Sequence, residues 1–63
     1  MTEPPIDWPA LIARLVERHG SQAEIGRQIG VHRVVVNRWA IGTRRPTGLY
    51  AQALLRLARQ GDT

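Results

Sequence analysis

Apolar side chains recur along this chain at spacings of three and four residues, the period of an amphipathic α-helix. Four stretches follow this period, and each is bounded by residues that start or stop helices. The first covers residues 8–19, between Asp7, an expected N-cap, and Gly20, an expected C-terminal stop. Pro9 falls in its first turn, where proline is tolerated. The apolar side of this predicted helix carries Trp8, Leu11, Ile12, Leu15, Val16 and His19.

The next two stretches are short and are separated by a glycine turn. Ser21 and Glu24 form a capping box, which places the start of a helix at Gln22. Gly30 ends this helix, and a third helix is predicted from about residue 32 to about residue 41. Two short helices around a tight turn are the layout of a DNA-binding helix-turn-helix.

Periodicity also predicts which sides of these two helices pack together. Ile25 and Ile29 share the inner face of the first, and Gly26 beside them allows a second helix to approach the backbone closely. Val31 is expected to fill the corner between the helices. On the second of them, the side predicted to be buried carries Val35, Val36, Trp39 and Ala40. The opposite side, predicted to be exposed, carries Arg33, Val34, Asn37 and Arg38.

A last helix is predicted from residue 47 or 48 to residue 60. Its expected inner arc consists of Leu49, Tyr50, Ala53, Leu54, Leu57 and Ala58. Leu55 projects from the opposite side, so it is expected to be exposed in a monomer. The aromatic residues Trp8, Trp39 and Tyr50 all lie on apolar stripes, and we therefore expect them in the core rather than as platforms for nucleic-acid bases.

Length and composition indicate one small all-α domain. The 63 residues are read as a single four-helix unit, with an N-terminal arm at 1–6, the helix-turn-helix at 21–41 and a frayed tail at 61–63. A chain of this size buries only about 60% of its unfolded surface, so its stability is expected to be marginal. It has no cysteine and no residues at metal-ligand spacing, so neither a disulfide, a metal nor a cofactor is expected to stabilise it. Oligomerisation is the remaining expectation.

No apolar run approaches the roughly 18 residues of a membrane span, and the N-terminus does not resemble a signal peptide. The sequence therefore predicts a cytoplasmic protein with no membrane partner.

Charge favours an anionic partner. Nine arginines and no lysine stand against five acids, giving a formal net charge of +4. The arginines at 33, 38, 44 and 45 cluster around the third helix, whereas Glu3, Asp7 and Glu17 lie near the other end of the chain. The arginines on the first and last helices are interpreted as solvated surface.

Several of these residues together carry a resemblance to a known family. They are Gln22, Ile25, Ile29, the Gly30-Val31 turn, Val36, Trp39 and the following segment Ile41-Gly-Thr-Arg-Arg-Pro46. The chain resembles, over most of its length, the helix-turn-helix of the phage Cro/repressor superfamily, which includes small Cro-like and antitoxin-like regulators of bacteria. The resemblance implies a lambda repressor-like DNA-binding fold. Two departures are visible: Gly26 replaces the usual alanine, and His32 replaces the usual serine or threonine cap.

The exposed side of the third helix is the predicted base-contacting surface. Arg33 and Arg38 offer paired donors that match guanine, and Asn37 can both donate to and accept from adenine. Val34 either meets a thymine methyl group or is incidentally exposed. His32 either contacts DNA or is an imperfect helix cap.

Phosphate contacts are predicted from residues flanking that helix. In the resembling repressors, the glutamine that matches Gln22 bonds a phosphate and braces the recognition helix. Thr43, Arg44 and Arg45 follow the helix on a loop, where side chains position a protein on the DNA backbone without reading sequence.

The sequence therefore predicts a small transcriptional repressor of phage or prophage type that occludes a two-fold symmetric operator as a homodimer. Leu55 is the predicted dimer contact, and no small-molecule ligand is expected. The alternative is a protein-interaction module, such as an antitoxin or adaptor. An enzyme is not supported, because the chain has two histidines, no cysteine and no paired carboxylates at one site.

Overall fold

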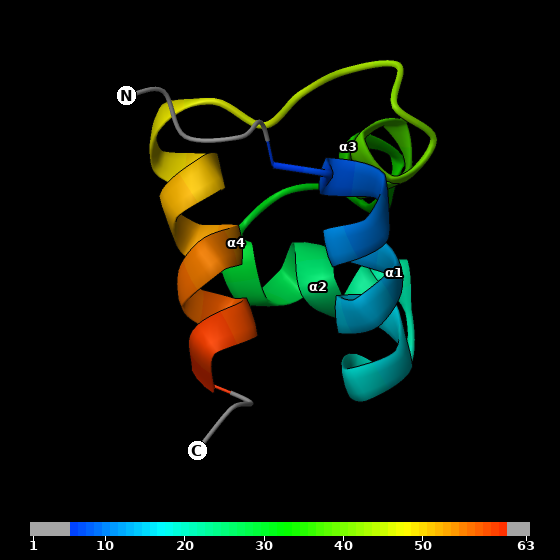
Figure 1. Ribbon diagram of the computed structural model, residues 1–63. Coiled ribbons are helices and arrows are strands. Elements are labelled where there is room, and N and C mark those ends of the chain that lie inside the picture. The colour runs from blue at the N-terminus through cyan, green and yellow to red at the C-terminus, as the bar shows by residue number, and fades with distance from the viewer. Residues whose placement is uncertain (1–5, 61–63) are drawn as a thin grey trace.

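The computed structural model describes residues 6–60 and contains four α-helices in that range (Figure 1). They are α1 (Trp8–His19), α2 (Gln22–Ile29), α3 (Arg33–Ala40) and α4 (Gly48–Gln60). The predicted all-α fold of four helices is confirmed. The predicted tail at 61–63 and all but the last residue of the predicted arm lie outside the described residues.

The ends of α1 follow the signals in the sequence. An Asp7 carboxylate oxygen accepts a hydrogen bond from the Ala10 amide at 3.2 Å, as an N-cap does. The helix ends at Gly20, whose φ of 101° is in the left-handed region, and whose amide donates to the Val16 carbonyl at 2.7 Å. Both predicted boundaries are confirmed.

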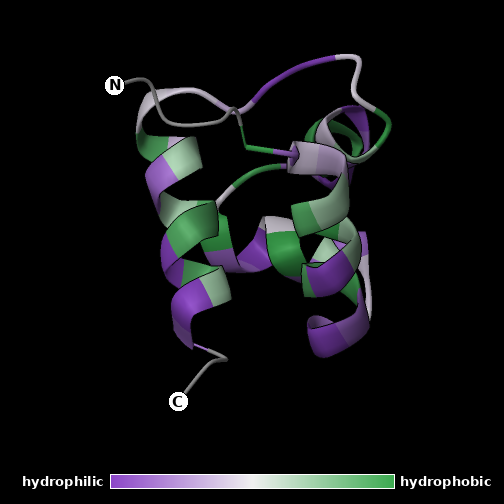
Figure 2. Cartoon of the chain, in the orientation of Figure 1, coloured by the Kyte–Doolittle hydropathy of each residue, from purple (hydrophilic) through white to green (hydrophobic). Residues whose placement is uncertain are grey.

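The core is a single cluster to which every helix contributes. Its buried members are Ile12, Leu15, Ile25, Val36, Trp39, Leu54 and Leu57. Figure 2 shows the apolar segments of the helices turned inward, and polar colour on their outer sides. Because the cluster is small, each large side chain in it carries a substantial share of the stability.

The first turn of α4 differs from the prediction. Leu49 is 80% exposed and Tyr50 is 44% exposed, although both were expected on the inner arc. The buried side of α4 is centred on Leu54, and Leu49 lies about 140° around the helix from it, at about 100° per residue. Tyr50 lies on the correct side but precedes Leu54, the first buried residue of the helix, by a full turn.

Leu55 also differs from the prediction, since it is half-buried rather than exposed. It lies about 100° from Leu54, at the flank of the buried side and not opposite to it.

Within residues 6–60, no helix is long and apolar enough to cross a membrane.

Candidate nucleic-acid interface

The turn between α2 and α3 is built on a close backbone approach at Gly26. The Gly26 carbonyl accepts hydrogen bonds from the amides of Gly30 and Val31, both at 2.8 Å. A Cβ atom added at Gly26 would collide with the Val31 carbonyl oxygen and lie 3.5 Å from the Arg33 amide nitrogen. The close approach predicted at Gly26 is confirmed. It also accounts for the departure from the family's alanine, because this turn leaves no space for a methyl group.

Half of the capping box predicted at the start of α2 is confirmed: among the described residues, the Glu24 carboxylate pairs with Arg27 and does not accept from the Ser21 amide. The Ser21 hydroxyl accepts a hydrogen bond from the Glu24 amide at 3.1 Å. The Glu24 carboxylate lies 3.5 Å from the Arg27 guanidinium, one turn along the surface of the helix. Gln22 is the first residue of α2 and is half-buried.

His32 caps α3. Its Nδ1 atom accepts a hydrogen bond from the Val34 amide at 3.1 Å, which replaces the hydroxyl of the usual serine or threonine cap. A ring nitrogen that accepts is unprotonated, so the proton of the neutral ring lies on Nε2. Of the two roles that the sequence left open for His32, the structure shows the cap.

The two sides of α3 are separated as the periodicity predicts. Val36 and Trp39 are buried, and Val35 and Ala40 are half-buried. The exposed side carries Arg33, Val34, Asn37 and Arg38. Neither Arg33 nor Arg38 has a carboxylate partner within residues 6–60, so both positive charges are available to a ligand.

The loop after α3 folds back on the end of that helix. The amides of Thr43 and Arg44 both donate to the Arg38 carbonyl, at 3.0 and 3.3 Å. Pro46 is buried and fixes the other end of the loop. Thr43, Arg44 and Arg45 are all exposed, so the three predicted phosphate contacts lie beside the C-terminal end of α3.

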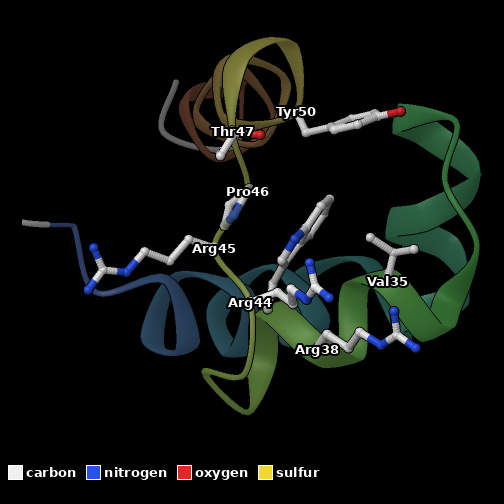
Figure 3. A pocket seen from close by; sticks show the side chains of 8 residues that line it. Val35, Arg38, Arg44, Arg45, Pro46, Thr47 and Tyr50 are labelled. Carbon is white, nitrogen blue, oxygen red and sulfur yellow. The ribbon is translucent and has the colours of Figure 1, made fainter.

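A hollow of about 260 Å³ lies between α3, this loop and α4 (Figure 3). Its lining residues are Val35, Arg38, Trp39, Arg44, Arg45, Pro46, Thr47 and Tyr50. In Figure 3 the Arg45 side chain reaches away from the hollow in one direction and Arg38 in the other, with Arg44 between them. The guanidinium groups thus form a strip of positive charge and do not converge on one point. A strip suits an extended polyanion better than a single small anion.

The loop arginines also border the start of α1. Arg44 and Arg45 also line a second hollow of about 540 Å³, together with Ile6, Asp7, Trp8, Pro9 and Gly42. Arg44 and Arg45 therefore lie between the start of α1 and α3.

The aromatic residues are only partly where the sequence placed them. Trp39 is 3% exposed and Trp8 is half-buried, so the prediction of packing is confirmed for these two. It is wrong for Tyr50, whose ring leans on Trp39 from the outside, with centroids 6.0 Å apart and planes tilted by 43°. Sequence reasoning missed Tyr50 and Thr47 at the hollow. The available signal was their place within two residues of Gly48, at the start of α4.

The structure brings together only part of the predicted site. Arg38, Arg44 and Arg45 share the first hollow, and Arg33, Val34 and Asn37 share the exposed side of α3 with Arg38. Gln22 and Leu55 line neither of these two hollows.

Comparison with known proteins agrees with this geometry. A family model described as Helix-turn-helix (HTH_3) matches residues 11–58. No curated protein and no solved structure matches the chain. The matched range contains the capped α2, the Gly26 turn and the exposed side of α3, together with most of α1 and α4. The chain therefore belongs to the helix-turn-helix family of the Cro/C1 repressor type, a family of DNA-binding domains rather than enzymes.

Proposed function

We propose that this protein is a sequence-specific transcriptional repressor that inserts α3 into the major groove of duplex DNA. The observation that carries the proposal is the division of α3 into two sides. Val36 and Trp39 hold the helix to the core, while Arg33 and Asn37 stand on its exposed side. Membership of a family of DNA-binding regulators supports the same interpretation.

The exposed side of α3 supplies the base contacts. Arg33 donates two parallel hydrogen bonds to guanine, and Asn37 pairs with adenine. Arg38 contacts a second guanine from the C-terminal half of the helix. Val34, 45% exposed within a polar surface, contacts a thymine methyl group. His32 donates from Nε2 to a base edge or a phosphate at the start of the helix, while its Nδ1 keeps the cap.

Residues on both sides of α3 hold the domain on the DNA backbone. Gln22 contacts a phosphate from the start of α2, and Thr43, Arg44 and Arg45 contact the strand that follows the loop. Such contacts fix register and orientation and carry no sequence information. The strip of guanidinium groups around the loop supports this assignment.

We propose further that the protein binds a two-fold symmetric operator as a homodimer and represses by occlusion, as a regulator of phage or prophage type would in the bacterial cytoplasm. A second copy doubles the number of base pairs contacted and buries additional apolar surface. The half-sites then lie about one helical turn, roughly 34 Å, apart. The half-burial of Leu55 removes the reason for placing the dimer contact there, and the most exposed apolar side chain on α4 is Leu49.

A protein-interaction module is the second candidate. The exposure of Leu49 and Tyr50 favours a protein contact on α4. The exposed side of α3 does not favour one, because protein interfaces have few charges at their centre and this side carries two arginines without a carboxylate partner among the described residues.

Selection of bound sequences from a random duplex pool tests the proposal. We expect enrichment of a short consensus that is repeated with two-fold symmetry. Recovery of no consensus, with binding that depends only on salt, would favour the second candidate.

A further inference from the structure

The ring of Tyr50 connects α4 to α3. It projects from the first turn of α4 and contacts the Trp39 ring, with centroids 6.0 Å apart, inside the range of about 4.5–7 Å at which two aromatic rings attract each other. Trp39 belongs to the buried side of α3. The contact therefore acts, through a core residue, on the helix that carries Arg33 and Asn37 on its other side.

This contact lies where α3 and α4 are not closely packed. The hollow of about 260 Å³ lies between them, with Val35, Trp39 and Tyr50 in its lining. In a filled interior, side chains on every side hold a helix in place, whereas the wall of a hollow lacks neighbours on one side. The position of α3 on this side therefore depends more on the Tyr50 ring than it would in a filled interior.

Tyr50 also faces the other helix of the helix-turn-helix. It lines a second hollow, of about 320 Å³, together with Ile29, the last residue of α2. Figure 3 shows its side chain extending from the start of α4 toward the side of the first hollow on which Val35 lies. The ring thus lies near the end of α2 and near α3, the two elements that the turn at Gly26 joins.

The Tyr50 ring is held by its apolar contact and not by its hydroxyl. Within residues 6–60, the hydroxyl has no hydrogen-bond partner. The side chain is 44% exposed and precedes Leu54, the first buried residue of α4, by one turn, so it adds little to the core. A phenylalanine at this position can make the same ring contact, and an alanine cannot.

We propose that Tyr50 is a positioning residue, which sets the placement of α3 through Trp39 and thereby determines sequence specificity without touching DNA. Base contacts need their donors held within about 0.5 Å of the productive geometry. A small displacement of α3 misaligns Arg33 and Asn37 with the base edges, whereas phosphate contacts carry no sequence information and survive it. The effect on DNA rests on the proposed function, and the effect on α3 stands without DNA.

The test compares Tyr50→Ala with Tyr50→Phe and with Leu49→Ala. Leu49 is the matched control, because it precedes Tyr50 in the same turn of α4, is 80% exposed and does not line the first hollow. Tyr50→Leu replaces Tyr50→Ala if the alanine variant does not fold.

The first measurement uses residual dipolar couplings of the backbone amides in the absence of DNA. These couplings report the orientation of α3 relative to α1 and do not change merely because a nearby ring is lost. We expect Tyr50→Ala to reorient α3, and Tyr50→Phe and Leu49→Ala to keep the orientation found in the parent.

The second measurement compares binding to the selected duplex and to a scrambled duplex. We expect Tyr50→Ala to lose about fivefold or more in affinity for the selected duplex and to bind the scrambled duplex as the parent does. Tyr50→Phe and Leu49→Ala should keep both affinities. A role in stability alone would lower both affinities by the same factor, through the folded fraction.

The inference is overturned if Tyr50→Ala leaves α3 in place, or if its losses on the two duplexes are equal. It is also overturned if Leu49→Ala behaves as Tyr50→Ala does, or if Tyr50→Phe does, since the latter would make the hydroxyl a DNA contact. A parent that does not prefer the selected duplex would overturn the proposed function instead, and the dipolar couplings would still decide whether Tyr50 positions α3.

Discussion

The Val31 carbonyl oxygen lies over the α-carbon of Gly26, in the space that a side chain at position 26 would occupy. The same glycine supplies the carbonyl that accepts the Gly30 and Val31 amides. Backbone groups that pack on the α-carbon of Gly26 and bond to its carbonyl therefore close the turn between α2 and α3. This closed turn fixes the position of α3 relative to α2.

Gly26→Ala should destabilise the domain. Alanine gains up to about 1 kcal/mol of helix propensity over glycine. The added methyl group must displace the Val31 backbone, and overpacking of this kind costs about 1–3 kcal/mol. We expect the clash to exceed the gain, with Tm lowered by roughly 4–8 °C for each kcal/mol of net loss. Thermal unfolding followed by circular dichroism measures it, and a variant as stable as the parent would show that the turn relaxes freely.

Trp39 and Tyr50 should respond very differently to truncation, although their rings are in contact. Trp39→Ala removes a side chain that is 3% exposed, costs about 3–5 kcal/mol and should leave a domain this small largely unfolded. Tyr50→Ala removes a ring that is 44% exposed and should leave a folded protein. Helical circular dichroism at 25 °C distinguishes them. A folded Trp39→Ala protein would mean that the core does not depend on this side chain.

His32→Ala should lose about 1 kcal/mol of stability, because the Val34 amide then has no side-chain acceptor. His32→Asn is the matched control, since asparagine is among the best N-caps. We expect asparagine to restore the stability measured by urea unfolding. Equal losses for both variants would show that the cap contributes little and that another property of the imidazole stabilises α3.

Arg45→Ala should weaken binding to every duplex sequence to a similar degree. Removing one phosphate contact reduces the slope of log K against log salt by about one unit. Arg59→Ala, in the last turn of α4, is the control and should leave the slope unchanged. Fluorescence anisotropy over a series of salt concentrations gives both slopes. A loss confined to the preferred sequence would instead make Arg45 a base contact.

The sequence predicted the parts of this fold that depend on local chemistry. Asp7, Ser21 and Gly20 form caps or stops with groups only a few residues away, and the sides of α3 follow from spacing alone. The errors lie in α4. Which side of that helix is buried depends on how the loop after α3 delivers it to the core, and the local pattern admits more than one rotation. Leu49 and Leu55 were misplaced for this reason, whereas Tyr50 lies on the correct side, one turn before the buried part of the helix.

The candidate site divides in the same way. The exposed side of α3 was predictable because the apolar and polar residues within this helix recur at helical spacing. The hollow that joins Arg38 to the loop was not, because it depends on two loop amides that return to the Arg38 carbonyl and on the burial of Pro46. The sequence left the role of His32 open, because a histidine that caps a helix and a histidine that contacts DNA can both stand directly before the helix.

If the exposed side of α3 distinguishes one DNA sequence from another, Arg33→Ala should impair that discrimination. Binding of the parent and the variant is measured on the selected duplex and on a scrambled duplex of the same length and composition, at one salt concentration. We expect Arg33→Ala to lose about 1–3 kcal/mol of binding free energy on the selected duplex and much less on the scrambled one. Equal losses on the two duplexes would contradict it.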